Sequence, residues 1–269
     1  MIGYCVPILP QLASFRLRVE IPSRYLGMPY RFGIGDASFF FKSGNPTLAK
    51  RLPLVVYDVV NAHLTDPDYR AMLDIAHVVT CSSPVMAEII KAVGRDAVVI
   101  PDPYENAERP AAVPDGRVLW FGHQANLASL KPYADIGPDL CTGEVWSPAS
   151  EARLLASAGV VLLTGNNPGA SSNRVVKALR AGRFVVVPED CPASWRELSE
   201  YIWIGDVREG IRWAFANREE ACRKVSAGQK YAKTHFSPQS IGSQWADLFA
   251  SILERATNKK KAGSVSISP

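Results

Sequence analysis

A short polar stretch at 171–174 has the residue types needed to bind an anion. Ser171, Ser172 and Asn173 are all good N-cap residues, and Arg174 follows them in what would be the first turn of a helix. The unpaired N–H groups and the dipole at such a helix start favour a phosphate, to which Arg174 could add a bidentate, charge-assisted contact. The alternative is ordinary helix capping beside a surface arginine.

Asp58 and His63 could do the acid–base chemistry. Asp58 lies near the end of the apolar run LPLVVYDVV (52–60), and His63 follows five residues later on a loop. A histidine at such a place titrates near neutral pH and could act as a general base. Alternatively, His63 caps the next helix and Asp58 satisfies local backbone groups.

A second basic group follows the first predicted strand. Ser14 is a natural N-cap, and Arg16 and Arg18 would lie in the first turns of a helix, where the dipole disfavours cations. Their presence predicts a contact with an acceptor or a diphosphate; the alternative is a salt bridge to Glu20 or Asp36.

We expect no metal and no bound cofactor. The DPD segment at 66–68 has the acidic spacing of a metal-binding DxD, but three residues recur by chance and acids are favoured at a helix start. The five cysteines are scattered without a CxxC pair, which favours reduced thiols in a cytoplasmic protein. The first ten residues contain two prolines and no basic segment, so we expect neither a signal peptide nor a membrane span.

The elements that must position these residues alternate along the chain. Apolar runs at 2–8, 30–33, 52–60, 77–82 and 97–102 predict strands, and the patterns at 15–26, 66–76 and 84–94 predict helices. The alternation restarts with strands at 117–122, 159–165, 183–189 and 201–206, and three helices are predicted over 207–217, 219–234 and 238–255. Such alternation is typical of a parallel, doubly wound sheet.

This pattern predicts two domains. Residues 1–105 form the first domain, the Pro-rich segment 106–116 a linker, 117–256 the second domain, and the lysine-rich segment 257–269 a disordered tail. A length of 269 residues allows two cores, and the hydrophobic fraction of 47% with 21% charged residues is that of a globular protein. The net charge of +4 permits a polyanionic partner without requiring one.

Three segments resemble the GT-B glycosyltransferases: VTCSSPVMAEI with VVIPDPYE, VLWFGHQAN, and SNRVVKALRAGRFVVVP. The resemblance implies an α/β fold of two Rossmann-like domains facing each other across a cleft, with a nucleotide-sugar donor held mainly by the second. It also implies that the turn after the first strand of the second domain faces the donor; here that turn contains Gly122, His123, Gln124 and Asn126. The segment KALRAG would belong to the donor-binding helix.

The chain departs from the family at two positions. Many members have two glutamates eight residues apart in this unit, whereas this sequence has Gly169 and Lys177. Lys177 could instead offer its charge to a donor phosphate, or it is a solvated lysine.

Three aromatic residues lie close together in the segment 195–203. Trp195, Tyr201 and Trp203 could stack on a base or a sugar, although aromatic residues in such a segment are more often part of the core.

The function expected from these observations is transfer of a sugar from a nucleotide-diphosphate sugar to a hydroxyl acceptor, a saccharide or another small molecule. Within this class, an alternative acceptor is a hydroxymethylated base in DNA, for which the basic residues Arg16, Arg18, Arg24, Arg31 and Lys42 would bind phosphates. A sugar-nucleotide epimerase or hydrolase, or a non-catalytic binding protein, is also compatible with the same fold.

Overall fold

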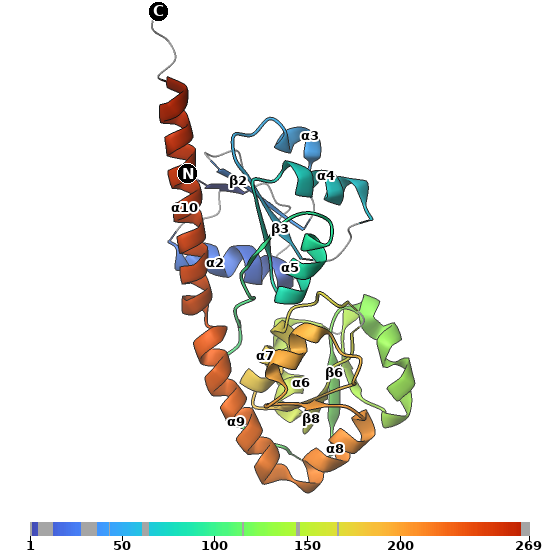
Figure 1. Ribbon diagram of the computed structural model, residues 1–269. Coiled ribbons are helices and arrows are strands. Elements are labelled where there is room, and N and C mark those ends of the chain that lie inside the picture. The colour runs from blue at the N-terminus through green and yellow to red at the C-terminus, as the bar shows by residue number, and fades with distance from the viewer. Residues whose placement is uncertain are drawn as a thin grey trace, which may run out of the picture. The chain divides into compact units, whose positions relative to one another are not determined.

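The computed structural model describes residues 2–4, 13–27, 37–42, 44–60, 65–114, 116–143, 146–165 and 167–264. The chain divides into two compact units (Figure 1). The first unit contains residues 1–103 together with 238–269, and the second contains residues 104–237.

The first unit contains a five-stranded parallel sheet with the order β1-β2-β3-β4-β5. Its strands are β1 (Ile2–Tyr4), β2 (Ala37–Phe41), β3 (Val55–Val59), β4 (Val78–Cys81) and β5 (Val98–Val99). Its helical elements are α1 (Ala13–Phe15), the π-helix η1 (Arg16–Glu20), α2 (Ile21–Tyr25), α3 (Pro46–Ala49), α4 (Pro67–Ile75), α5 (Pro84–Lys91) and α10 (Pro238–Ser264).

Helices cover both faces of this sheet, because successive strand residues point to opposite sides. Phe39 and Val56 pack with Phe15 of α1 and with Trp245 of α10. From the other face, Phe40 and Tyr57 join the cluster that contains Tyr69, Met72, Met86 and Ile90 of α4 and α5.

The second unit contains another five-stranded parallel sheet, with the order β10-β9-β8-β6-β7. Its strands are β6 (Val118–Phe121), β7 (Asp139–Cys141), β8 (Val160–Leu162), β9 (Phe184–Val187) and β10 (Trp203–Ile204). Its helical elements are η2 (Gln124–Ile136), α6 (Pro148–Ser157), α7 (Asn173–Arg180), η4 (Ala193–Leu198), α8 (Val207–Ala216) and α9 (Arg218–His235).

The strand order of this second sheet reverses at β6. The chain moves from β6 to β7 on one side and then returns to β8 on the other side. The loops that leave the carboxyl ends of β6 and β8 therefore diverge, and such a switch point is where open α/β sheets bind ligands.

The fold class predicted from the sequence, two Rossmann-like α/β domains, is confirmed. The strand β2 was not predicted, nor were η2, β7 and α6. The strand expected at 30–33 lies outside the described residues.

The observed division of the chain differs from the predicted domains at its carboxyl end. Helix α10 packs on the first sheet rather than on the second (Figure 1). The reason is an apolar stripe of α10 that belongs to the same cluster as Phe39 of β2 and Val56 of β3; its residues are Ile241, Trp245, Phe249 and Ile252. The helix also continues to Ser264, into the segment for which we expected disorder.

The predicted linker is part of the second unit. The backbone N–H of Arg109 donates to the Arg180 carbonyl at 2.9 Å, and that of Ala112 donates to the Gly182 carbonyl at 3.0 Å. Val113 is buried in the core of this unit. Residues 104–114 are thus held along the second unit despite their proline content. None of the helices in the described residues is long and apolar enough to cross a membrane.

Candidate functional site

The carboxyl ends of β6 and β8 are tied together at the switch point. Trp120 of β6 donates its indole N–H to the Thr164 hydroxyl just beyond β8, at 2.9 Å. The same hydroxyl lies 2.8 Å from the hydroxyl of Ser129 in η2. These contacts fix the start of both diverging loops relative to each other.

Arg174 of α7 bridges the ends of the two strands. Its Nη1 donates to the Phe121 carbonyl at 3.3 Å, and its Nη2 donates to the Thr164 carbonyl at 2.8 Å. The guanidinium carbon also lies 5.1 Å from the centre of the Trp195 ring, within cation–π range. The guanidinium is therefore held at the switch point by two carbonyls and one aromatic face.

Two glycines make room for this guanidinium. A Cβ atom at Gly122 would lie 2.8 Å from Nη1 of Arg174, and one at Gly165 would lie 3.0 Å from Nη2. Gly122, which was predicted to face the donor, thus lies against Arg174.

The charge of Arg174 has no carboxylate partner among the described residues. Burial lowers the pKa of Arg174 to about 10, and no acidic residue contributes to the shift. Arg183 also donates to carbonyls, but two of them, those of Leu155 and Ala156, belong to the last turn of α6, where the helix dipole is negative. Arg174 has no such compensation, so an anion at the switch point would relieve its desolvation.

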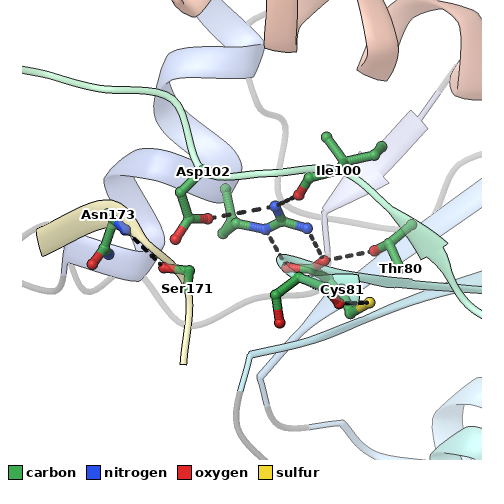
Figure 2. A network of polar contacts seen from close by, with 9 residues as sticks. Thr80, Cys81, Ile100, Asp102, Ser171 and Asn173 are labelled. Atoms are coloured by element: carbon green, nitrogen blue, oxygen red, sulfur yellow. Dashed lines mark hydrogen bonds and ion pairs between the residues drawn. The ribbon is translucent and has the colours of Figure 1, made fainter. Parts of the chain in front are cut away.

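The predicted anion-binding turn lies directly before Arg174. Ser172 precedes α7 but makes no side-chain cap hydrogen bond, and its hydroxyl donates to Glu197 Oε1 at 2.9 Å. The backbone N–H of Asn173 faces the Ser171 hydroxyl at the long distance of 3.5 Å (Figure 2). The start of α7 is thus weakly capped by side chains. Its first backbone N–H groups can then donate to an anion.

The remaining predicted donor contacts lie in the loop after β6. His123 accepts the N–H of Ala125 through Nδ1 at 3.2 Å, so that Nε2 carries the proton of the neutral ring. Asn126 donates its backbone N–H to the His123 carbonyl at 2.9 Å. The side chains of His123 and Gln124 are exposed at this edge of the second sheet.

Lys177 lies in an ion-pair cluster instead of facing a free edge. Its Nζ contacts Glu105 at 2.7 Å and also forms an ion pair with Glu151. Burial lowers the pKa of Lys177, but the charges of Glu151 and Glu105 outweigh it, so that the pKa is raised. Glu105 and Glu151 therefore compensate the positive charge of Lys177, which the sequence analysis had offered to a donor phosphate.

Arg18 and Asp58 of the first unit bind each other rather than lying open to substrates. Asp58 is fully buried; it accepts two hydrogen bonds from Arg18 and one from Thr80, the last at 2.6 Å. Arg18 also forms an ion pair with Asp102, at 3.4 Å, and donates to the Ile100 carbonyl (Figure 2). The predicted catalytic role of Asp58 and the predicted role of Arg18 as an acceptor or diphosphate contact are therefore corrected: both side chains are saturated within the core.

The other predicted residues of the first unit are Ser14, Arg16 and His63. Ser14 in α1 and Arg16 at the start of η1 are partly exposed. His63 lies outside the described residues.

Sequence reasoning did not assign Thr164, Gly165, Trp195 or Glu197 to this site. Thr164 and Gly165 end the run GVVLLTG, and their polar and glycine character at a strand end was an available signal. Trp195 was assigned to the core, where it lies, and Glu197 carried no pattern that distinguishes it from a surface acid. Across the described ranges, no group of three or more His, Cys, Asp or Glu side chains could hold a metal ion.

Comparison with known proteins matches no family model and no curated protein. Among solved structures, the chain is similar to Anabaena HepE in complex with UDP, with a TM-score of 0.59, 13% identity, and coverage of 87% of this chain and 82% of that one. It is also similar to sucrose-phosphate synthase from Thermosynechococcus elongatus, with a TM-score of 0.60, 11% identity, and coverage of 93% of this chain and 81% of that one. A third similar structure is WaaG, a glycosyltransferase involved in lipopolysaccharide biosynthesis, with a TM-score of 0.60, 12% identity, and coverage of 92% of this chain and 99% of that one. These structures are GT-B glycosyltransferases, and the chain has the GT-B fold.

Proposed function

We propose that this protein is a glycosyltransferase that binds a nucleotide-diphosphate sugar at the carboxyl edge of its second sheet. The observation that carries the proposal is the guanidinium of Arg174, held between the ends of β6 and β8 without a carboxylate partner among the described residues. A partly buried cation beside a weakly capped helix start is matched to an anion such as a diphosphate.

The chemistry of glycosyl transfer explains the value of this arrangement. As the glycosidic bond to the donor breaks, negative charge develops on the leaving diphosphate. Arg174 and the N–H groups at the start of α7 would stabilise that charge at fixed positions. We propose that the reaction needs no metal ion and no covalent cofactor.

The nature of the donor is suggested by the similar structures. Three HepE structures contain UDP, UDP-glucose, or UDP together with glucose. We propose a uridine-diphosphate hexose as the first donor to test, bound with its diphosphate near Arg174 and with His123, Gln124 and Asn126 as further donor contacts.

A hydroxyl group of a saccharide or another small molecule is the proposed acceptor. His63 remains our candidate for the base that receives its proton, since Asp58 is saturated by Arg18 and Thr80. A DNA acceptor is less favoured, because two of the basic residues that would bind phosphates are engaged: Arg18 is buried, and Arg24 forms an ion pair with Glu20.

Titration calorimetry with UDP tests the donor site. The Arg174→Met variant should bind UDP about 30-fold more weakly or worse, because a charge-assisted contact to phosphate is lost. Arg183→Met is the matched control: it removes an arginine that also donates to carbonyls, and its folded fraction should bind UDP as the unmodified protein does. Equal UDP affinity in Arg174→Met and the unmodified protein would contradict the proposed site.

A second candidate function is binding of the nucleotide sugar without turnover. The saturation of Asp58 favours it, since the first unit then offers one acid–base candidate fewer. UDP release from UDP-glucose, measured with and without a panel of saccharide acceptors, separates the two functions. Acceptor-dependent release supports the transferase, free glucose without an acceptor indicates a hydrolase, and UDP-glucose binding without any release indicates a binding protein.

A further inference from the structure

The segment after β9 contacts the anion-binding turn residue by residue. Ser194 of η4 donates its hydroxyl to the Ala170 carbonyl, and Trp195 donates its indole N–H to the Ser171 carbonyl at 3.0 Å. Glu197 then accepts the Ser172 hydroxyl at 2.9 Å. We call Ser194, Trp195 and Glu197 the η4 clamp.

Within the η4 clamp, Trp195 is the residue that contacts Arg174. Its side chain is completely buried, and its ring lies under the guanidinium at 5.1 Å. The ring edge would also lie 3.6 Å from a Cβ atom at Gly165. The same indole therefore makes two contacts. Its N–H binds the Ser171 carbonyl just before α7, and its ring contacts the guanidinium of Arg174 at the switch point.

These contacts restrict the two groups that must meet the anion. An arginine side chain loses considerable rotamer freedom when it is ordered, and a partner that is already held in place avoids this loss on binding. The two carbonyl acceptors of Arg174 fix the direction of its N–H groups, whereas the Trp195 ring limits movement of the guanidinium toward the ring face.

We propose that Trp195 is a positioning residue for the diphosphate, acting through Arg174 and Ser171 without touching the ligand. This inference rests on the proposed function of the Arg174 site. It assigns a role in binding to a residue whose burial alone would mark it as part of the core.

Two substitutions separate the two contacts of Trp195. Trp195→Phe keeps a ring for Arg174 but removes the N–H donor, and should weaken UDP binding about fivefold. Trp195→Leu removes both, and should weaken it about fivefold further. Trp203→Phe is the matched control, because its indole also donates to a backbone carbonyl, that of Asp206 at 3.1 Å. It should bind UDP within about twofold of the unmodified protein.

Repeating both substitutions in the Arg174→Met background tests the route through Arg174. There the difference in UDP Kd between the Phe and Leu variants should fall below about twofold, because no guanidinium remains to be positioned. An undiminished difference would overturn the proposal, as would wild-type UDP affinity in Trp195→Leu. Failure of the unmodified protein itself to bind UDP would instead refute the proposed function.

An NMR measurement checks the stacking without a ligand. The side-chain N–H signal of Arg174 should carry a ring-current shift in the unmodified protein and in Trp195→Phe, and should lose it in Trp195→Leu. An Arg174 signal that is identical in all three proteins would overturn the positioning role even if a variant is less stable.

Discussion

The carboxylate of Asp58 holds the guanidinium of Arg18 through two hydrogen bonds, of 3.0 and 2.5 Å, inside the first unit. Burial lowers the pKa of Arg18, but the charges of Asp58 and Asp102 outweigh that effect and raise it above its usual range. Arg18 thus stays charged in the core, and its charge is shared between two acids. The ion pairs link the helical segment 13–25 to β3 and to Asp102, which follows β5.

Substitutions in this network should act on stability. Asp58→Asn should lower the free energy of unfolding of the first unit by about 3 kcal/mol or more, because it leaves Arg18 with a weakened partner in the core. Arg18→Met should cost still more, since it removes the cation that lies between Asp58 and Asp102 and leaves Asp58 buried without it. Urea denaturation followed by a probe in the first unit measures both.

Thr80→Val is the milder control for this prediction. It removes one hydrogen bond to Asp58 and should cost about 1–2 kcal/mol. If Asp58→Asn unfolds like the unmodified protein yet abolishes UDP release from UDP-glucose, the structural role is wrong and the catalytic one returns.

The order of elements could be predicted from the sequence wherever apolar runs and helix caps alternate. The helix predicted over 66–76 illustrates this, since the Asp66 side chain accepts N–H groups of its first turn. Helix α10 was assigned to the wrong unit because an apolar stripe shows that a helix packs, but not on which sheet.

The candidate site could be predicted in part. The polar residues after β8 marked the switch point, because parallel strands present their carboxyl ends at one edge. The pairing of Arg18 with Asp58 could not be foreseen, since the two residues are forty positions apart and only the packing of η1 in the core of the first unit brings them together. Lys177 was misplaced for the same reason: Glu105 and Glu151 are remote in sequence.

Gly122 should be needed for the placement of Arg174. The new methyl group in Gly122→Ala would lie 2.8 Å from Nη1 and displace that nitrogen away from the Phe121 carbonyl. Since a side-chain end can move, we expect a loss of stability of no more than about 1–2 kcal/mol and a UDP affinity lower by about fivefold or more. Calorimetry and thermal unfolding measure the two effects.

The Arg174→Met background provides the control for Gly122→Ala. Methionine places no charged group against Gly122, so the alanine should cause no further loss of UDP affinity there. An equal loss in both backgrounds would mean that Gly122 acts through the ligand or the loop rather than through Arg174.

Lys177→Met should reduce stability and spare UDP binding. The substitution leaves Glu151 buried without its cation, and should cost about 2–4 kcal/mol at neutral pH. Because the pKa of Lys177 is raised in the folded protein, its contribution is complete below its ordinary value of 10.5 and is lost as the pH rises through the folded value. The stability difference from the unmodified protein should be constant from about pH 6 to 9 and shrink above about pH 10.5.

Denaturation at a series of pH values and calorimetry with UDP test both parts of this prediction. Glu105→Gln serves as the control, since Glu105 is the more exposed of the two partners, and it should cost less than Lys177→Met. A UDP affinity that falls by more than about fivefold in Lys177→Met would restore the phosphate contact that the sequence suggested.

Helix α10 should be required for the first unit to fold, although it is the last element of the chain. Trp245 is completely buried, packs edge-on against Phe39 at 5.6 Å, and lies over Arg18 at 5.0 Å. Ending the chain at Ser237 would expose this face of β2 and remove the ring beside Arg18. The resulting loss of stability should be far larger than the roughly 3–5 kcal/mol typical of one truncated core aromatic residue.

The first unit should therefore unfold in the shortened chain. Residues 104–237 contain all five strands of the second sheet and should still unfold cooperatively. Limited proteolysis and amide NMR spectra of the shortened chain distinguish the units. A chain ending at Thr257 is the control, because it keeps Ile241, Trp245, Phe249, Ile252 and Leu253, the α10 side chains that pack on the first sheet among the described residues. Protected amides from β2 and β3 in the chain that ends at Ser237 would show that the first sheet needs no cover from α10.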